Sequence, residues 1–484
     1  MRINTIFKRI KLIAFGVGAA AIVGCSSTGG PLGLSPQQEQ AIGLQEHPKI
    51  VAAFGGELQD PEVNNYVRSV TNRLIAAGDQ PQTPIKITVL DSPVVNAMAL
   101  PGHVYVTRGL LALANSEAEL AGVMGHELGH VYERHTAKRV SRGNLAQIGT
   151  VLGAILTGSA ETAQAIGQAA QLYVLNFTRE QEYEADLVGV RLLARAGYSP
   201  IAEAYFLNTL GRWSSLQAQI AGVTQQTPEF LKTHPNSENR VRRAAQEAQV
   251  LQQNGAPSEL GRDRYLTVID GLLYGDDAAK QGFIQGNTFI HPDLGFAFSV
   301  PNGFQLQNSS NAVLARSQAT GAQMQFTLAN AQETPKQIIE GPMSEQLKVR
   351  LGPVREGRIA GRPAASGAGR LQTQNGEIDV TAYVVKWEGA TNYVFLWVTP
   401  PGQTRNLARA MDSSVQSLRD VDPRQINVPP RRQVDVVNVR RGDTPATVAR
   451  SMAFPSYKED YFRVINGLGA QEGLNAGEKV KLIR

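Results

Sequence analysis

The chain of 484 residues contains a single cysteine, Cys25, which excludes an internal disulfide. It also lacks a strong charge of one sign. The formal net charge is +5, and positions 1–24 hold four basic residues and no acidic one, so the remainder carries about +1 (5 − 4). This balance gives no support for binding to nucleic acid, and we expect no nucleic-acid partner.

Long apolar runs are missing as well. The stretch from Leu12 to Val23 follows a basic start and has the length of a signal peptide rather than of a membrane-spanning helix. Ile22-Val23-Gly24-Cys25 resembles a bacterial lipobox, in which the cysteine is lipidated, and the alternatives are an uncleaved anchor or a chance cysteine. We therefore expect a lipoprotein signal peptide at 1–24 and a lipidated Cys25. This predicts a membrane-anchored protein of the bacterial cell envelope that faces the periplasm, with the outer membrane as the expected site.

Only seven histidines are present, yet two of them lie in the run His126-Glu127-Leu128-Gly129-His130. On a helix, residues four apart share one face, so both imidazoles can reach one metal ion. Glu127 lies beside them, where its carboxylate can take a proton from a zinc-held water. Ser116 and Glu119 read as a capping box that starts this helix.

A further ligand is available in the acidic segment Thr178–Arg195, which also has a helical pattern. Glu182 and Asp186 are four residues apart and share a face, so one can bind the metal while the other accepts the free ring N–H of a bound histidine. Glu184 is the competing ligand. Because it lies about 200° round the helix from Glu182, the two cannot face one metal together.

With these motifs, residues 46–250 resemble the gluzincin zinc metalloprotease family that includes the HtpX, BepA, Oma-type and CAAX prenyl endopeptidases. Asn96–Gly102 resembles the strand that borders the cleft in that family, and Thr233-His234-Pro235 with Arg240 resembles its downstream histidine–arginine pair. The helical patterns between residues 144 and 175 indicate a buried helix pair or a hydrophobic cleft wall rather than a membrane span.

The resemblance implies one Zn²⁺ per chain. Its ligands would be His126, His130 and Glu182, with Asp186 behind them and Glu127 as the catalytic base. His234 and Arg240 would stabilise the oxyanion. For His234 two roles stay open, an oxyanion donor or a fourth zinc ligand that gates the site.

The rest of the chain predicts a multidomain α+β protein. Short alternating runs indicate strands, for example at 296–300, 324–328, 380–385 and 393–398, with helices at 336–350 and 403–418 between them. This domain faintly resembles PsbP/Mog-like proteins. The last fifty residues resemble a LysM module of βααβ order, for which glycan binding and a purely structural role are the two readings. The expected order is a signal peptide (1–24), a lipidated cysteine and flexible tether (25–45), a mainly helical, zincin-type metallopeptidase domain (46–255), a linking segment (256–286), a small α+β domain (287–421), a Pro/Arg linker (422–433) and a LysM-like module (434–484).

The sequence thus predicts a zinc-dependent endopeptidase that hydrolyses misfolded or unassembled envelope proteins. Two alternatives stay open. In the first, the chain is an outer-membrane assembly factor or chaperone whose proteolysis is secondary. In the second, it is a peptidoglycan cross-link peptidase that the LysM-like module targets to the glycan.

Overall fold

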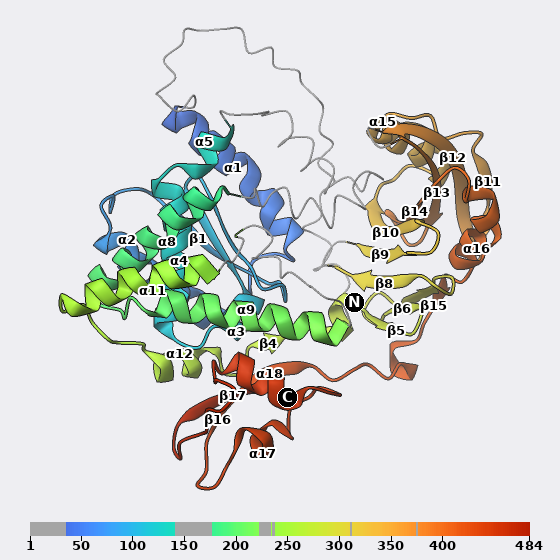
Figure 1. Ribbon diagram of the computed structural model, residues 1–484. Coiled ribbons are helices and arrows are strands. Elements are labelled where there is room, and N and C mark those ends of the chain that lie inside the picture. Colours follow the sequence, from blue (N-terminus) through green and yellow to red (C-terminus); the bar gives the residue numbers. More distant parts are fainter. Residues whose placement is uncertain (1–34, 141–176, 222–233, 235–237, 310–311, 374–375) are drawn as a thin grey trace. The chain divides into compact units, whose positions relative to one another are not determined.

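The computed structural model of the chain describes residues 35–140, 177–221, 234, 238–309, 312–373 and 376–484 (Figure 1). Its described residues fall into two compact units. One unit holds residues 277–430, and the other holds the residues up to 276 together with 431–484. The first is called the β-rich unit, and the second is called the peptidase unit after the domain that the sequence predicts in it.

The structure does not describe every segment for which the sequence makes a prediction. The signal peptide, Cys25 and the helix pair at 144–175 lie outside the described residues. The expected flexible tether at 25–45 is wrong for its second part, because helix α1 begins at Pro36. Ser35 caps that helix, and the Gln38 side chain returns the contact in a capping box. Within the described residues, no helix combines the length and the apolar character needed to cross a membrane.

The peptidase unit is mainly helical around a small three-stranded sheet of order β1-β3-β2, in which β1 and β3 are parallel and β2 is an antiparallel edge. Its elements up to residue 274 are α1 (Pro36–Ala53), α2 (Pro61–Ala77), β1 (Lys86–Leu90), β2 (Ala97–Leu100), β3 (His103–Thr107), α3 (Arg108–Leu113), α4 (Glu117–Tyr132), α5 (His135–Val140), α8 (Arg179–Arg195), α9 (Ala202–Ala221), α11 (Glu238–Gln253), α12 (Arg262–Ile269) and β4 (Leu273–Tyr274).

The start of α4 differs from the predicted capping box in one contact. The Ser116 hydroxyl accepts from the Glu119 amide at 3.1 Å, as expected. The Glu119 carboxylate accepts from the Asn115 amide at 2.9 Å, one residue before the N-cap. Both contacts still satisfy amide donors at the helix start, and α4 is buried along its whole length from Glu117 to His130. The prediction for α8 is confirmed, with Thr178 as its N-cap and its last residue at Arg195.

The C-terminal residues have the predicted strand–helix–helix–strand order: β16 (Arg432–Asn438), α17 (Pro445–Ala449), α18 (Lys458–Ile465) and β17 (Lys479–Ile483). They are not a separate body, however. β16 pairs with β17 on one side and with β4 on the other, and Val434 and Leu482 share one hydrophobic core with Leu266 and Leu120. The predicted linking segment 256–286 is therefore part of the peptidase unit up to residue 276. This pairing could not be predicted, because β4 is only two residues long and has no detectable alternation of apolar and polar residues.

Lys481 connects this C-terminal part to the end of α3 by hydrogen bonds. Its ammonium group is completely buried and donates to the carbonyls of Ala112, Leu113 and Ala114 at 3.0, 3.1 and 2.6 Å. These carbonyls end α3, directly before the N-cap of α4. Burial lowers the pKa of Lys481 well below its ordinary value. The last strand thus supports the segment from which the His126–His130 helix starts.

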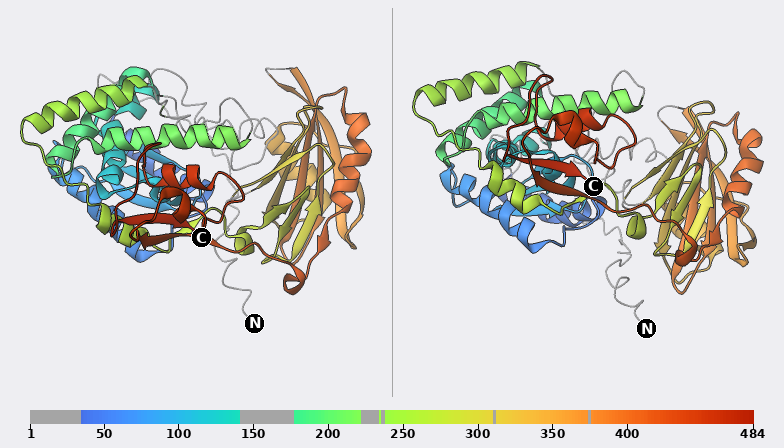
Figure 2. Two further views of the ribbon diagram at one scale, coloured as in Figure 1. Left: turned by 60° about the horizontal axis from the view of Figure 1, so that its bottom comes forward. Right: turned by 90° about the horizontal axis from the view of Figure 1, so that it is seen from below.

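The β-rich unit contains a seven-stranded antiparallel sheet of order β11-β12-β13-β14-β10-β9-β8 and a four-stranded sheet of order β15-β7-β6-β5 (Figure 2). Met411 and Val415 of α16 pack with Phe296, Phe326 and Trp397 into one core. A second core, built on Ile338 and Leu347, covers the other face of the large sheet. The four predicted strands and the two predicted helical regions are confirmed. The elements are α13 (Ala278–Gln281), β5 (Phe283–Gln285), β6 (Thr288–His291), β7 (Phe296–Ser299), β8 (Gln305–Asn308), β9 (Val313–Arg316), β10 (Gln323–Asn330), α14 (Pro335–Ile338), η2 (Ile339–Met343), α15 (Ser344–Leu347), β11 (Arg355–Ile359), β12 (Arg362–Thr373), β13 (Gly376–Lys386), β14 (Thr391–Thr399), α16 (Thr404–Gln416), β15 (Arg419–Asp420) and η3 (Pro423–Gln425).

Replacing Lys481 tests how firmly the C-terminal part is fixed. We expect Lys481→Met to lower the free energy of unfolding by about 2–4 kcal/mol, because it leaves buried carbonyls without a donor. Lys479→Met on the same strand is the matched control, since the Lys479 ammonium contacts only the exposed Thr267 hydroxyl among the described residues. Lys479→Met should change the free energy of unfolding by about 0.5 kcal/mol or less. Urea unfolding followed by tryptophan fluorescence measures both. Equal effects would contradict the anchoring role.

Candidate metal centre

Four buried side chains of the peptidase unit converge on one point: His126, His130, Glu182 and His234, here called the ligand group. One possible ligand atom of each lies within 4.8 Å of those of the others. The His126 Nε2 atom is 3.0 Å from His130 Nε2 and 3.1 Å from His234 Nδ1. The Glu182 carboxylate lies 3.5 Å from His130 Nε2 and 3.6 Å from His126 Nε2.

These separations fit a metal ion. Ligand atoms about 2.0–2.1 Å from a tetrahedral zinc are about 3.3 Å apart, close to the distances observed. Imidazole nitrogens that face one another at 3 Å cannot all act as donors or all as acceptors, and a cation between them removes this conflict. The donor set of imidazole nitrogen and carboxylate oxygen is one that zinc accepts.

Close packing of α4 on α8 brings the two motifs together. A Cβ atom on Gly129 would lie 2.9 Å from the Ala185 Cα atom and 3.0 Å from its carbonyl oxygen. A Cβ atom on Gly125 would lie 3.1 Å from the Gly189 Cα atom. Only glycine at these positions lets the helix backbones approach so closely. Glu182 and Asp186, at the predicted spacing on α8, consequently face the histidines of α4.

Asp186 and Arg240 form a support behind the ligand group. The His126 Nδ1 atom is 2.9 Å from Asp186 Oδ1, which leaves Nε2 of that imidazole directed at the ligand group. The Arg240 Nε and Nη2 groups donate to the two oxygens of Asp186 at 2.8 and 2.6 Å. Although burial opposes it, the Arg240 charge holds the pKa of Asp186 well below its usual range.

Arg240 has further partners. Its Nη1 atom lies 2.7 Å from Glu182 Oε2 and donates to the backbone carbonyl of His234 at 3.1 Å. All three nitrogens of the guanidinium are thus engaged by Asp186, Glu182 and His234. The sequence suggested an oxyanion role for Arg240, whereas these contacts favour a positioning role. Thr233 and Pro235, on either side of His234, lie outside the described residues.

His130 has its own support. Its Nδ1 atom lies 2.9 Å from His135 Nδ1, and His135 Nε2 lies 3.0 Å from the Glu184 carboxylate. Glu184, the competing ligand candidate, therefore faces His135 and away from the ligand group, in agreement with the helical geometry. Phe177 stacks on the His130 ring with centroids 3.8 Å apart. The ring of His130 is thus fixed on two sides.

Glu127 is buried beside the ligand group, with no exposed surface. Neither of its carboxylate oxygens has a hydrogen-bond partner among the described residues, and Oε1 is 3.5 Å from His234 Nε2. Burial raises its pKa to about 8. A buried carboxylate with an elevated pKa and no competing hydrogen bond is suited to accept a proton.

A further acid, Glu203 on α9, was not predicted from the sequence. It forms a second group of possible ligands with His126 and Asp186, and all three side chains are buried. Burial raises the pKa of Glu203 to about 7. A Cβ atom on Gly122 of α4 would lie 2.6 Å from Glu203 Oε2, so this glycine provides the space for the carboxylate. By itself, a glutamate in the first turn of a helix is an ordinary feature of sequence.

The predicted cleft strand is β2, the edge of the three-stranded sheet. Residues 97–100 pair antiparallel with β3 from Ala97–Val106 to Leu100–His103 and pack against α4. Among the described residues, β2 pairs on one side only, and an edge strand of this kind can pair with an extended peptide.

Comparison with known proteins agrees with this geometry. Residues 61–248 match the peptidase family M48. The chain is 29% identical over 255 residues to the beta-barrel assembly-enhancing protease of Yersinia pestis, covering 50% of each chain. It is 28% identical over 253 residues to the protein of that name in Escherichia coli K12, covering 49% of this chain and 50% of that one. It is 30% identical over 223 residues to the mitochondrial metalloendopeptidase OMA1 of Schizosaccharomyces pombe, covering 44% of this chain and 62% of that one. The chain thus spans about half the length of the first two relatives. Residues 61–248 are a metallopeptidase domain of peptidase family M48.

Proposed function

We propose that this chain is a zinc-dependent endopeptidase that hydrolyses internal peptide bonds of unfolded or unassembled proteins in the bacterial cell envelope. The observation that carries the proposal is the convergence of His126, His130 and Glu182 next to the Glu127 carboxylate, whose oxygens accept no hydrogen bond from the described residues. Three protein ligands and one exchangeable position are typical of catalytic zinc, and His234, the fourth member of the ligand group, would occupy that position only while the site is closed.

The chain's own residues have distinct tasks in the reaction. A zinc ion in the ligand group would polarise the scissile carbonyl and make a neighbouring water more acidic. Glu127 accepts the proton of the attacking water and transfers it to the leaving amine. Asp186 keeps His126 in the tautomer with Nε2 directed inward, and Arg240 holds Asp186 ionised. The edge strand β2 is the surface on which an extended substrate would lie.

The position of His234 supports a role in controlling this centre. Its Nδ1 atom lies within the ligand group, 3.0 Å from Glu182 Oε1, so the imidazole can take the fourth position at the metal. An imidazole there leaves no position for the attacking water. This supports the gating role among the two that the sequence left open. In that role, substrate opens the site by moving His234 away.

The substrates and the location follow from the relatives and the amino terminus. Two relatives are named beta-barrel assembly-enhancing proteases, which supports envelope proteins as substrates. The lipobox-like sequence at Cys25 supports an anchor in the outer membrane, with the catalytic unit facing the periplasm. For residues 434–484, the βααβ order is compatible with a LysM-like glycan-binding module.

Substitutions of the ligands test the metal. We expect His126→Ala, His130→Ala and Glu182→Ala each to weaken zinc binding by more than about 100-fold, since changes to outer partners alone cost 10–100-fold. Glu127→Gln should keep zinc and lower cleavage of an unfolded protein by about 10²–10⁴-fold, because it removes the base and no ligand. Metal content and casein cleavage are the measurements.

Glu184→Ala is the matched control for Glu182→Ala, two residues away on the same helix. It should weaken zinc binding by about 100-fold at most, and so less than Glu182→Ala, because the Glu184 carboxylate contacts His135 behind His130 and not the ligand group itself. Full zinc occupancy in Glu182→Ala would show that the third ligand is another residue. Comparison of trapped proteins and muropeptides in cells with Glu127→Gln separates protein substrates from a cell-wall substrate or from a chaperone role.

Removing His234 tests the gate. If the imidazole closes the resting site, His234→Ala should raise basal cleavage of an unfolded substrate, and self-cleavage, several-fold at unchanged zinc content. The double variant with Glu127→Gln should stay inactive, which assigns the extra cleavage to this site. Uniformly lower rates in His234→Ala would instead leave His234 as an oxyanion donor only.

A further inference from the structure

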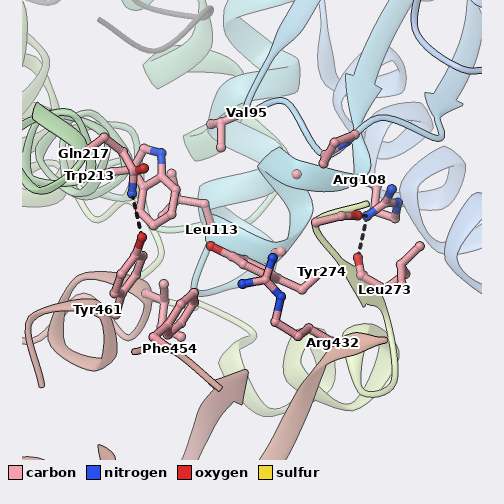
Figure 3. Close-up of a pocket in the computed structure, with 15 residues that line it drawn as sticks. Val95, Arg108, Leu113, Trp213, Gln217, Leu273, Tyr274, Arg432, Phe454 and Tyr461 are labelled. Carbon is pink, nitrogen blue, oxygen red and sulfur yellow. Dashed lines mark hydrogen bonds between the residues drawn. The ribbon is translucent and has the colours of Figure 1, made fainter. Parts of the chain in front are cut away.

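A cavity of about 230 Å³ lies elsewhere in the peptidase unit, and no member of the ligand group lines it. Its wall comes from several elements: α3, α9 and β4 on one side, and the C-terminal residues from β16 to α18 on the other (Figure 3). The cavity exists only because the C-terminal part is docked on the peptidase helices. None of the predicted functions uses it.

The wall of the cavity is rich in aromatic rings. Trp213, Tyr274, Phe454 and Tyr461 line it. The rings of Phe454 and Tyr461 stack with centroids 3.8 Å apart and planes 4° from parallel, and Trp213 meets Tyr461 edge-on at 5.8 Å. The Tyr461 hydroxyl accepts from the Gln217 amide at 3.4 Å. These contacts fix the rings in advance, so an apolar group can enter without ordering the wall.

The charged groups of the wall are two arginines, Arg108 and Arg432, and no carboxylate lines the cavity. Arg108 is engaged through two of its three nitrogens: its Nε group donates to Asp91 at 2.8 Å, and its Nη1 group donates to the carbonyls of Leu273 and Gly275 at 2.7 and 2.9 Å, while Nη2 has no hydrogen-bond partner among the described residues. These contacts hold β4 in place, and β4 supplies Tyr274 to the wall.

Arg432 differs from Arg108. Its guanidinium lies near the rings of Tyr274 and Phe454, 5.9 and 5.7 Å from their centroids, and forms no side-chain hydrogen bond or ion pair with any described residue. In Figure 3 it points into the space between these rings and Tyr461. Asp276 interacts with both arginines at longer range without forming an ion pair, and burial raises its pKa. Arg432 is thus available to an anion, and a planar guanidinium suits a carboxylate best.

The size and polarity of the cavity restrict the kind of ligand that it can bind. Sites for complete small molecules usually measure about 300–1,000 Å³, so this cavity fits a smaller group. A sugar ring would need many hydrogen-bond partners, whereas most of this wall is aromatic or aliphatic. A carboxylate joined to one apolar side chain matches both Arg432 and the rings. The free carboxyl end of a polypeptide has this chemistry.

We infer that this cavity binds the C-terminal residue of a polypeptide substrate, with its carboxylate at Arg432 and a large apolar side chain against Trp213, Phe454 and Tyr461. The inference rests on the proposed function, because it gives the endopeptidase a second contact with its substrate outside the metal centre. A substrate with an exposed, apolar carboxyl end would be held there while an internal bond reaches Glu127.

The test uses the full chain with Glu127→Gln, so that the probe is not cleaved. The probe is a fluorescein-labelled twelve-residue peptide that ends in phenylalanine, with either a free carboxylate or a carboxamide, and anisotropy gives the Kd. We expect the carboxamide to bind at least about 10-fold more weakly, the effect of losing a charge-assisted hydrogen bond. Arg432→Gln should weaken the binding of the acid peptide by a similar factor and leave the Kd of the amide peptide unchanged.

Arg441→Gln is the matched control, because Arg441 is an exposed arginine of the same C-terminal part that does not line the cavity. It should change neither Kd. Trp213→Leu should weaken the binding of both peptides. Equal binding of the acid and amide peptides to the chain with Glu127→Gln alone would overturn the inference, whether or not Arg432→Gln folds. Displacement of both peptides alike by N-acetylglucosamine trimers would overturn it in favour of a glycan site.

The two proposals fail separately. If the acid peptide binds as expected but the chain with native Glu127 cleaves no unfolded protein, the proposed function fails and the carboxylate site stands. If that chain cleaves while both peptides bind equally, only the carboxylate site fails.

Discussion

The close crossing of α4 and α8 is the constraint on which the metal centre depends. A Cβ atom on Gly129 or on Gly125 of α4 would lie only 2.9 Å from the Ala185 Cα atom or 3.1 Å from the Gly189 Cα atom of α8, so a side chain at either position would require the helices to shift. Since His126 and His130 alternate with these glycines along α4, the same turns supply both the contact and the ligands. A wider crossing would move Glu182 and Asp186 away from the imidazoles by about the thickness of a methyl group, and the group of ligands would no longer fit one ion.

The second constraint is electrostatic. Glu127, Glu182, Asp186 and Glu203 are all at least 97% buried, together with Arg240, which contacts Asp186 and Glu182. Buried charges are tolerated when they are paired and costly when they are not. Burial raises the pKa of Glu127 and of Glu203 to about 8 and 7, the direction expected for a carboxylate that is removed from water. A divalent cation among His126, His130 and Glu182 would balance a further negative charge, which links folding of this core to metal binding.

Much of this centre could be predicted from local patterns. The four-residue spacings of His126 with His130 and of Glu182 with Asp186 require only that both segments be helices. The argument that Glu184 faces away from Glu182 also held, for the same reason. Glu203 could not be predicted, because its burial depends on α9 crossing α4 at Gly122. The docking of the C-terminal strands was missed as well. It depends on the pairing of β16 with two residues, Leu273 and Tyr274, and on Lys481 reaching three carbonyls far away in the sequence. Such contacts leave no periodic signal.

The central claim is that the ligand group holds zinc through imidazole nitrogens and one carboxylate. X-ray absorption at the zinc edge of the purified full chain tests it most directly. The account predicts about four nitrogen or oxygen neighbours at about 2.0–2.1 Å. It also predicts the scattering of three imidazoles, one of which disappears in His234→Ala. A six-coordinate shell of oxygen atoms, or a zinc content that does not depend on His126, would contradict it.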